Sequence, residues 1–337
     1  MKFRFEFDIP KLAHPIQHSH RLFLIGSCFT ENIGAKLKKN KFSVLENPHG
    51  ILFNPVSVSE AIIDYVEHKE FKETDIFNLN EGWHSWKHHS RLSGNNSEQA
   101  LGNINKSIGN ASEFLKHADF IFITLGSAWV YTLTENAPAA IPGSVAANNH
   151  KAPADWFYRK LLSIEDILST LDEMIHRLFL FNSSIQIIFT ISPVRHLREG
   201  AIENNRSKAA LIQAVHQLKD KFENIYYFPA YELVLDDLRD YRFYAEDLVH
   251  PNYFATQYVW EKLVEACMAA DAKKLMEEIA AVNLAFNHKA FNPDSDQHKK
   301  FLSSFYNKTK VLQEQYPYLD FSKEMNYFKP PSPLKGA

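Results

Sequence analysis

The stretch that decides the fold is Leu22-Phe23-Leu24-Ile25-Gly26-Ser27-Cys28-Phe29-Thr30-Glu31-Asn32-Ile33-Gly34. It begins as a continuous apolar run, which is typical of a strand buried on both faces of a sheet. Gly26 supplies a residue that can turn sharply, and a helix is expected to begin near Thr30. A strand that leads directly into a helix predicts one unit of a parallel α/β sheet.

Four further runs have the same character, at 42–45, 120–125, 185–191 and 225–228, and all are rich in Ile, Phe and Val. Helical patterns alternate with them. A capping box, Ser57 to Glu60, predicts a helix over 58–68, and another opens at Ser163. Further helices are expected over 205–222 and 253–270. The sequence therefore predicts a three-layer, doubly wound α/β fold with a mostly parallel, flavodoxin-like sheet.

The chain of 337 residues is long enough for an α/β domain with additions. We expect that domain over residues 1–271, with an insertion near 70–118. Residues 272–337 are expected to form appended C-terminal helices and a tail, of which the Pro-rich residues 329–337 should be loose. These helices could cover the functional site, pack on the back of the sheet or make a dimer contact. The oligomeric state stays open.

The composition, 45% hydrophobic and 23% charged, excludes a disordered chain. A net charge of −3 gives no basic field, so nucleic acid and membrane surfaces are not expected partners. Acidic residues within 1–8 are unlike a secretory signal, and the longest apolar stretch, 120–134, is too short to span a bilayer. The two cysteines suggest no disulfide framework. These features predict a cytoplasmic protein.

Ser27 follows the first strand at the start of a helix, where free N–H groups and the helix dipole favour negative charge. That position suits a nucleophile whose attack creates an oxyanion. The alternative is that Ser27 only caps the helix. Cys28 is a rival nucleophile, since a helix N-terminus lowers a thiol pKa, and its alternative is a small buried side chain.

Asp247 lies three residues before His250, just ahead of the last helix of the domain. This spacing can turn both side chains to one side, so that the carboxylate orients the imidazole as a general base. The alternative is an Asp–His pair that braces a loop.

The two motifs together resemble the SGNH (GDSL-type) hydrolases, in which the serine lies in the first block and Asp and His in the last. A closer resemblance is to the GSCFA family, carried by Gly26-Ser27-Cys28-Phe29 and by the segments 47–55, 83–90, 124–129, 192–196 and 205–209, within roughly residues 20–255. The resemblance implies the SGNH-type fold and a Ser27–Asp247–His250 triad.

The resemblance also implies an oxyanion hole made by the backbone N–H groups of Cys28 and Gly50. The third block departs from the SGNH pattern, because Gly126-Ser127-Ala128-Trp129 lacks the usual Asn. Loss of such a donor costs on the order of a hundredfold or more in rate. Asn54 is a candidate to supply the amide from another loop.

Five residues are expected to line the substrate site: His89, Gly126, Trp129, Arg195 and His196. Arg195 could bind an anionic group or pair with a nearby acid. The 16 histidines include His84 and His88 at i, i+4, but no zinc-binding spacing occurs. We therefore expect neither a metal nor another cofactor.

These observations predict a serine hydrolase acting on an ester, with O-acyl (acetyl) groups on a carbohydrate as the substrate class that the SGNH resemblance suggests. An acyltransferase with the same triad stays open. The missing third-block Asn keeps a binding or scaffold protein as an alternative. A metal-dependent phosphoesterase using Asp247 and His250 is a third hypothesis.

Overall fold

The computed structural model describes residues 4–329, so residues 1–3 and 330–337 lie outside the described part, and with them all but the first residue of the segment 329–337 that was predicted to be loose. A five-stranded, all-parallel sheet forms the centre, with the strand order β10-β9-β5-β1-β2. Counted along the chain this is the 2-1-3-4-5 order of flavodoxin-like folds. The fold prediction is confirmed. The strands are β1 (Arg21–Gly26), β2 (Ser43–Glu46), β5 (Phe120–Leu125), β9 (Gln186–Ile191) and β10 (Ile225–Tyr227).

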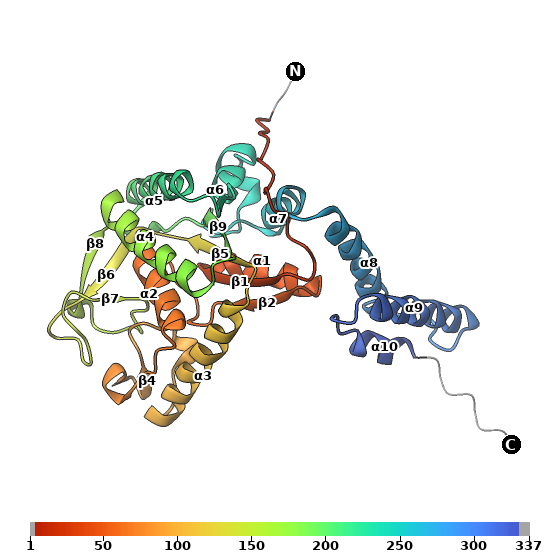
Figure 1. Cartoon of the computed structure of the whole chain (residues 1–337), viewed down its shortest axis with the longest axis horizontal. Helices are drawn as coiled ribbons and strands as arrows, with labels where there is room; N and C mark the ends of the chain where they lie inside the picture. The colour runs from red at the N-terminus through yellow and green to blue at the C-terminus, as the bar shows by residue number, and fades with distance from the viewer. Residues whose placement is uncertain (1–3, 330–337) are drawn as a thin grey trace.

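Alternate strand side chains enter two separate apolar cores, which gives the three layers (Figure 1). Phe23, Ile121 and Ile187 pack against one set of helices, whereas Leu22, Phe120 and Ile188 pack against the other. The first face is covered by α2 (Pro55–Val66), α3 (Ser97–Lys116), α4 (Ile164–Phe181) and α5 (Ala201–Lys221). The second face is covered by α1 (Cys28–Lys39) and α7 (Tyr253–Cys267).

Helix starts follow the local capping chemistry. Ser163 and Asp166 form the predicted capping box of α4. The prediction for α2 is wrong at its start, because Asn54 and not Ser57 is the cap. The Asn54 side chain accepts a hydrogen bond from the Ser57 N–H at 2.8 Å, and Pro55 takes the first helical position, which suits its fixed φ. The helix α1 likewise begins at Cys28, before Thr30.

Two additions interrupt the α/β order. The segment 70–118 holds the hairpin β3 (Phe77–Leu79) and β4 (Gly82–His84) together with α3. A second addition, after β5, was not predicted. It is an antiparallel sheet of β7 (Val145–Ala146), β6 (Trp129–Leu133) and β8 (Phe157–Leu161). Short helical turns complete the body: Glu73–Asp75, Ser90–Leu92, Ala154–Trp156, Leu197–Glu199, α6 (Ala230–Glu232), Leu233–Asp237 and Tyr241–Phe243.

The C-terminal helices α8 (Ala270–Phe286), α9 (Asp296–Gln315) and α10 (Ser322–Phe328) project away from the sheet (Figure 1). They share a separate apolar core that includes Leu275, Leu312 and Phe321. Lys41 Nζ lies 2.9 Å from Glu324 Oε1, and Asn283 Nδ2 donates to the Lys39 carbonyl. Since Lys39 ends α1 and Ser27 precedes it, these contacts lie at the end of α1 opposite Ser27.

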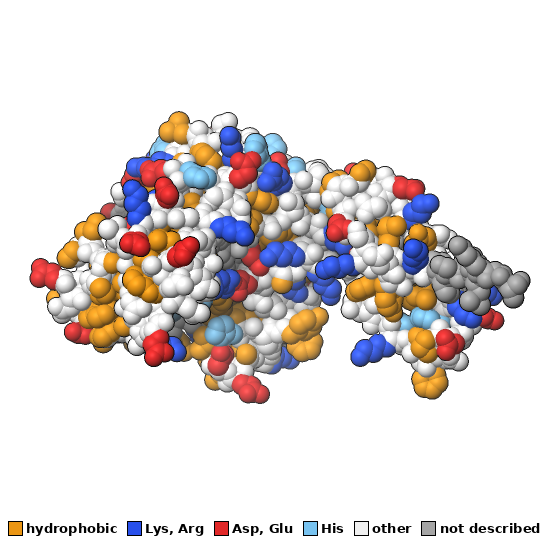
Figure 2. Space-filling model, turned by 90° about the horizontal axis from the view of Figure 1, so that it is seen from below, with side chains coloured by type: hydrophobic (Ala, Val, Ile, Leu, Met, Phe, Trp, Pro, Cys, Tyr) orange, Lys and Arg blue, Asp and Glu red, His pale blue; other side chains and the backbone are white. Residues whose placement is uncertain are grey.

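Charged side chains of both signs are interspersed on the face shown in Figure 2, over the body and over the C-terminal helices alike. This agrees with the small net charge. Within residues 4–329 no helix is both long enough and apolar enough to cross a membrane.

Candidate active site

The candidate site lies at the carboxyl ends of β1 and β5, where the strand order reverses and where open α/β sheets bind their ligands. Gly26 makes the turn possible. Its φ is +140°, and a Cβ there would lie 2.2 Å from the Thr124 carbonyl oxygen. Only glycine fits this close approach of β1 to β5. The next residue, Ser27, therefore emerges at the point of reversal.

Ser27 occupies the N-cap position of α1, but its hydroxyl does not cap the helix. The residue is 1% exposed, and its Oγ has no hydrogen-bond partner among the residues described. Its backbone N–H donates to the Thr124 carbonyl at 3.1 Å. The capping alternative is thus wrong for the side chain, and a buried hydroxyl is left free at a helix N-terminus.

Asp247 and His250 form the predicted pair. His250 Nδ1 lies 2.6 Å from Asp247 Oδ2, while Asp247 Oδ1 accepts the N–H groups of Val249 and His250. The His250 backbone hydrogen bond, then the imidazole, lowers the pKa of Asp247 to about 2. Both side chains are about half exposed. No hydrogen bond joins this pair to Ser27 in the described structure.

Arg195 braces the loop that carries this pair. Its guanidinium donates to the Leu248 carbonyl at 2.7 Å, its N–H donates to the Val249 carbonyl, and it stacks 4.1 Å from the Tyr244 ring centroid. The sequence predicted an acid or an anionic group as the partner of Arg195, but the hydrogen-bond partners in the structure are backbone carbonyls. These contacts of Arg195 hold the loop that carries His250 in place.

His196 belongs to a second imidazole–carboxylate pair. Its ring Nδ1 lies 3.2 Å from Glu199 Oε2, and its backbone N–H donates to Asn204 Oδ1. Burial lowers the pKa of His196 against the opposing effect of Glu199. The ring centroid lies 6.3 Å from that of Phe53. Phe53 in turn packs on Gly126, so His196 lies near the Ser27 turn, as predicted.

Two of the predicted oxyanion donors are already engaged. The Gly50 N–H donates to the Asn47 carbonyl at 2.7 Å, inside a tight turn where Gly50 has a φ of +82°. The Asn54 amide caps α2, with its Nδ2 donating to Ser57 Oγ at 3.0 Å. The single Gly50 N–H is therefore used within its own loop, whereas Asn54 Nδ2 gives one of its two N–H groups to Ser57 and keeps the other.

Cys28 is the first residue of α1, two residues before the predicted start near Thr30, and N–H groups there lack intrahelical acceptors. Its thiol is a different matter. Burial raises the pKa of Cys28, with the nearby Lys208 charge opposing this only weakly. A raised pKa keeps the sulfur protonated, which disfavours Cys28 as the nucleophile.

Of the three remaining predicted residues, Gly126 is the one that a recorded contact in residues 4–329 places beside Ser27. A Cβ at Gly126 would lie 3.3 Å from Ser27 Cβ and 3.2 Å from Phe53 Cδ1, so Gly126 adjoins the serine. His89 packs against Gly50, where a Cβ would come within 2.2 Å, and burial lowers the pKa of His89. Trp129 begins β6, and its indole N–H is buried without a partner among the described residues.

Sequence reasoning missed the buried polar face of α5. Lys208 Nζ donates to the carbonyls of Gly126 at 2.7 Å and Ser192 at 2.6 Å, and Ser207 Oγ accepts the Ala128 N–H. Lys208 is 1% exposed. A signal existed: Lys208 lies three and seven residues before Leu211 and Val215 on the apolar face, which predicts burial.

The histidines outside this site make protein contacts. His49 stacks on His88 at 4.1 Å, and its Nδ1 lies 2.6 Å from the Tyr65 hydroxyl. His84 is in β4, so the helical i, i+4 geometry with His88 is absent. Within residues 4–329, no group of three or more His, Cys, Asp or Glu side chains is arranged to hold a metal ion.

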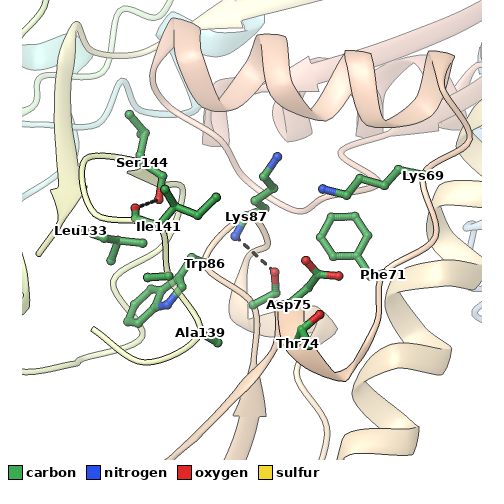
Figure 3. A pocket seen from close by; sticks show the side chains of 13 residues that line it. Lys69, Phe71, Thr74, Asp75, Trp86, Lys87, Leu133, Ala139, Ile141 and Ser144 are labelled. Atoms are coloured by element: carbon green, nitrogen blue, oxygen red, sulfur yellow. Dashed lines mark hydrogen bonds between the residues drawn. The ribbon is translucent and has the colours of Figure 1, made fainter. Parts of the chain in front are cut away.

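A cavity of about 460 Å³ lies between the two additions (Figure 3). Lys69 and Phe71 line one side, and Trp86 and Leu133 line the other. Its lysines face acids, since Lys87 Nζ lies 3.5 Å from Glu60 and 3.8 Å from Asp64. None of its lining residues belongs to the candidate site at Ser27.

The chain matches the model of the GSCFA family over residues 21–263 and that of the GSCFA domain protein, C-terminal domain, over residues 279–330. No curated protein matches it. Two solved structures resemble it distantly. One is a carbohydrate esterase family 3 from Talaromyces cellulolyticus (TM-score 0.34, 8% identity, 78% of this chain and 99% of that chain). The other is an acetyl xylan esterase (Est2A) from Butyrivibrio proteoclasticus (TM-score 0.36, 13% identity, 74% and 64%). Scores at this level do not extend the neighbours' activities to this chain.

Proposed function

The chain belongs to the GSCFA family, and from that premise we propose that it is a serine hydrolase of the SGNH type that cleaves an ester. One observation carries the proposal. The Ser27 hydroxyl is buried and unbonded among the described residues at the N-terminus of α1, at the reversal point of the sheet. A hydroxyl left without partners there is suited to attack, because the helix terminus favours the negative charge that attack creates.

The Asp247–His250 pair supplies the base. In the proposed reaction His250 Nε2 takes the Ser27 proton as Oγ bonds to the acyl carbon, and returns it to the leaving alcohol. Water then repeats the sequence on the acyl-enzyme. Asp247 holds Nδ1, as the 2.6 Å contact supports, and keeps the imidazole in the required tautomer. The reaction requires the exposed His250 ring to approach Ser27 when substrate binds, as catalytic hydrogen bonds often tighten only then.

The proposed substrate class is a small molecule or carbohydrate that bears an O-acyl group, by analogy with SGNH relatives. An acyltransferase would use the same steps with a second alcohol in place of water. A binding or scaffold protein is the second candidate function, and the absent hydrogen bond between Ser27 and His250 favours it.

Fluorophosphonate labelling with mass-spectrometric mapping tests the proposal. We expect an adduct on Ser27 of the wild type that is lost in Ser27→Ala and in His250→Ala. The matched control is His117→Ala, which removes an exposed histidine after α3 and should keep the adduct. No adduct, under conditions that label a known esterase, would favour the scaffold function. An adduct on Cys28 would assign the neighbouring residue as nucleophile.

A further inference from the structure

We propose that Asn47 and Lys208 make the Ser27 turn an anion-stabilising site, in which Asn47 donates to the oxyanion and the Lys208 ammonium stabilises its charge from behind. The inference deepens the proposed function and rests on it. It assigns the groups that take over from the amide missing in the third block. Asn47 would be a catalytic residue, and Lys208 a positioning residue that acts through its charge and through Gly126.

Asn47 is fixed against the turn by its own hydrogen bonds. Its Oδ1 accepts the Gly26 N–H at 2.9 Å, and its N–H donates to the Leu24 carbonyl at 2.8 Å. The residue is 3% exposed and has a φ of +44°, which asparagine tolerates better than most residues. Its Nδ2 is buried without an acceptor among the residues described. Such a group is costly unless a ligand oxygen satisfies it.

Lys208 lies on the other side of the same turn. Its Nζ donates to the Gly126 carbonyl, and Gly126 is the residue whose Cβ position would be 3.3 Å from Ser27 Cβ. The hydrogen-bond acceptors recorded for this ammonium in residues 4–329 are two backbone carbonyls, of Gly126 and Ser192. Two carbonyl dipoles compensate a buried charge only in part, so a negative charge formed nearby would be strongly stabilised.

Three features at the Ser27 turn are of donor or positive character, and the acidic Glu31 in the first turn of α1 opposes them. The N-terminus of α1 contributes the N–H of Cys28, which has no acceptor within the helix, and the positive end of the helix dipole. Asn47 adds a neutral donor and Lys208 a cation. When Oγ bonds to the acyl carbon, the carbonyl electron pair moves onto oxygen, and this oxyanion matches the set. On collapse the pair returns, the bond to the leaving alcohol breaks, and the alcohol takes the proton from His250.

Two variants test the assignment with little change in shape. Asn47→Asp keeps an oxygen for the Gly26 N–H but removes the donor. Lys208→Met keeps the length of the side chain but removes the charge. At a pH below 7, where folded Lys208 holds its proton, we expect each to slow fluorophosphonate labelling of Ser27 by about a hundredfold or more. The controls are Asn182→Asp, a buried amide that bonds to Leu115 and Ala118, and Lys36→Met, a part-buried lysine of α1. They should label within a few-fold of wild type. Melting curves check that every variant folds.

A second readout does not need a working nucleophile. We expect inorganic phosphate to bind the Ser27→Ala protein, and ³¹P NMR measures this binding. We expect the binding to be lost when Asn47→Asp or Lys208→Met is combined with Ser27→Ala. Phosphate binding without any labelling of wild type would keep the anion site and overturn the hydrolase. Labelling of Asn47→Asp and Lys208→Met at the wild-type rate would keep the hydrolase and overturn the anion site. Slow labelling with undiminished phosphate binding, or no phosphate binding to Ser27→Ala, would overturn the anion site.

Discussion

A single buried lysine gives the candidate site a pH-dependent stability. Burial lowers the pKa of Lys208 from its ordinary 10.5 to about 7. Between these two values the unfolded chain holds a proton that the folded chain has released. The free energy of unfolding therefore rises with pH across this window, at up to about 1.4 kcal/mol per pH unit. Below pH 7 both states are protonated, and Lys208 adds no slope.

Lys208→Met removes this dependence. We expect the variant to be most stable relative to wild type at or below pH 7, and the advantage to shrink as the pH rises to 9. Urea denaturation of both proteins at several pH values measures the difference in unfolding free energy. A difference that stays constant from pH 6 to pH 9 would show that Lys208 keeps an ordinary pKa in the folded protein.

Gly26 is the residue on which the turn depends most. A Cβ at this position meets the Thr124 carbonyl oxygen at 2.2 Å, and the φ of +140° is strained for any other residue. We expect Gly26→Ala to lower the unfolding free energy by at least about 2 kcal/mol. Gly102→Ala is the control, since no atom lies within 4 Å of the added Cβ in α3. It should stabilise the protein by roughly 0.5–1 kcal/mol. Equal denaturation midpoints for the two variants would contradict this account.

At the scale of elements, the sequence predicts what is set by continuous apolar runs. Four of the five core strands are of this kind, β2 being the short and partly exposed Ser43–Glu46, and the capping box at Ser163 marks α4 correctly. The antiparallel strands β6, β7 and β8 were missed because they are short and carry polar residues such as Thr132 and Lys160. The start of α2 was predicted wrongly because the sequence offers two N-caps there. The helix begins after Asn54, with Pro55 in the first position, and not after Ser57.

The candidate site divides in the same way. Asp247 and His250 could be paired from the sequence because their contact is local, three residues apart. Gly126 and His196 could be placed near Ser27 because the ends of parallel strands meet at one edge. The engagement of Gly50 and Asn54 in their own loops, and the free Nδ2 of Asn47, could not be predicted. These depend on which acceptor each N–H finds within the folded chain.

The loop between β2 and α2 places Phe53 beside the Ser27 turn. The Phe53 carbonyl accepts the N–H groups of Gly126 and Ser127, and its ring, 38% exposed, packs on Gly126 beside the serine. We expect Phe53→Ala to raise the fluorophosphonate labelling rate of Ser27 several-fold, because it uncovers a hydroxyl that is otherwise buried. Phe291→Ala, which removes a fully exposed ring far along the chain, should leave the rate unchanged. A rate unchanged in Phe53→Ala would mean that another element covers Ser27.

At the scale of the whole molecule, the α/β domain and the C-terminal helices have separate apolar cores, and Lys41 of the domain contacts Glu324 of α10. Lys41 Nζ contacts Glu324 and the Asp320 carbonyl, and Glu324 is almost fully buried. Lys41→Met leaves that carboxylate without its partner, at a cost on the order of 1–3 kcal/mol. We expect faster amide hydrogen exchange in α10 and unchanged labelling of Ser27. Slower labelling would show that the C-terminal helices influence the site.

The order of the elements along the chain determines when the candidate site can form during synthesis. Ser27 follows the first strand of the chain, whereas Asp247 and His250 precede α7, which packs beside α1 on the same face of the sheet. Because a ribosome delivers the N-terminal part first, the serine turn emerges long before its proposed base. The serine turn also requires β5, because the Thr124 carbonyl packs directly against Gly26. Under the proposed mechanism, a nascent chain would therefore hold Ser27 without its base, and activity would arise only after α7 docks.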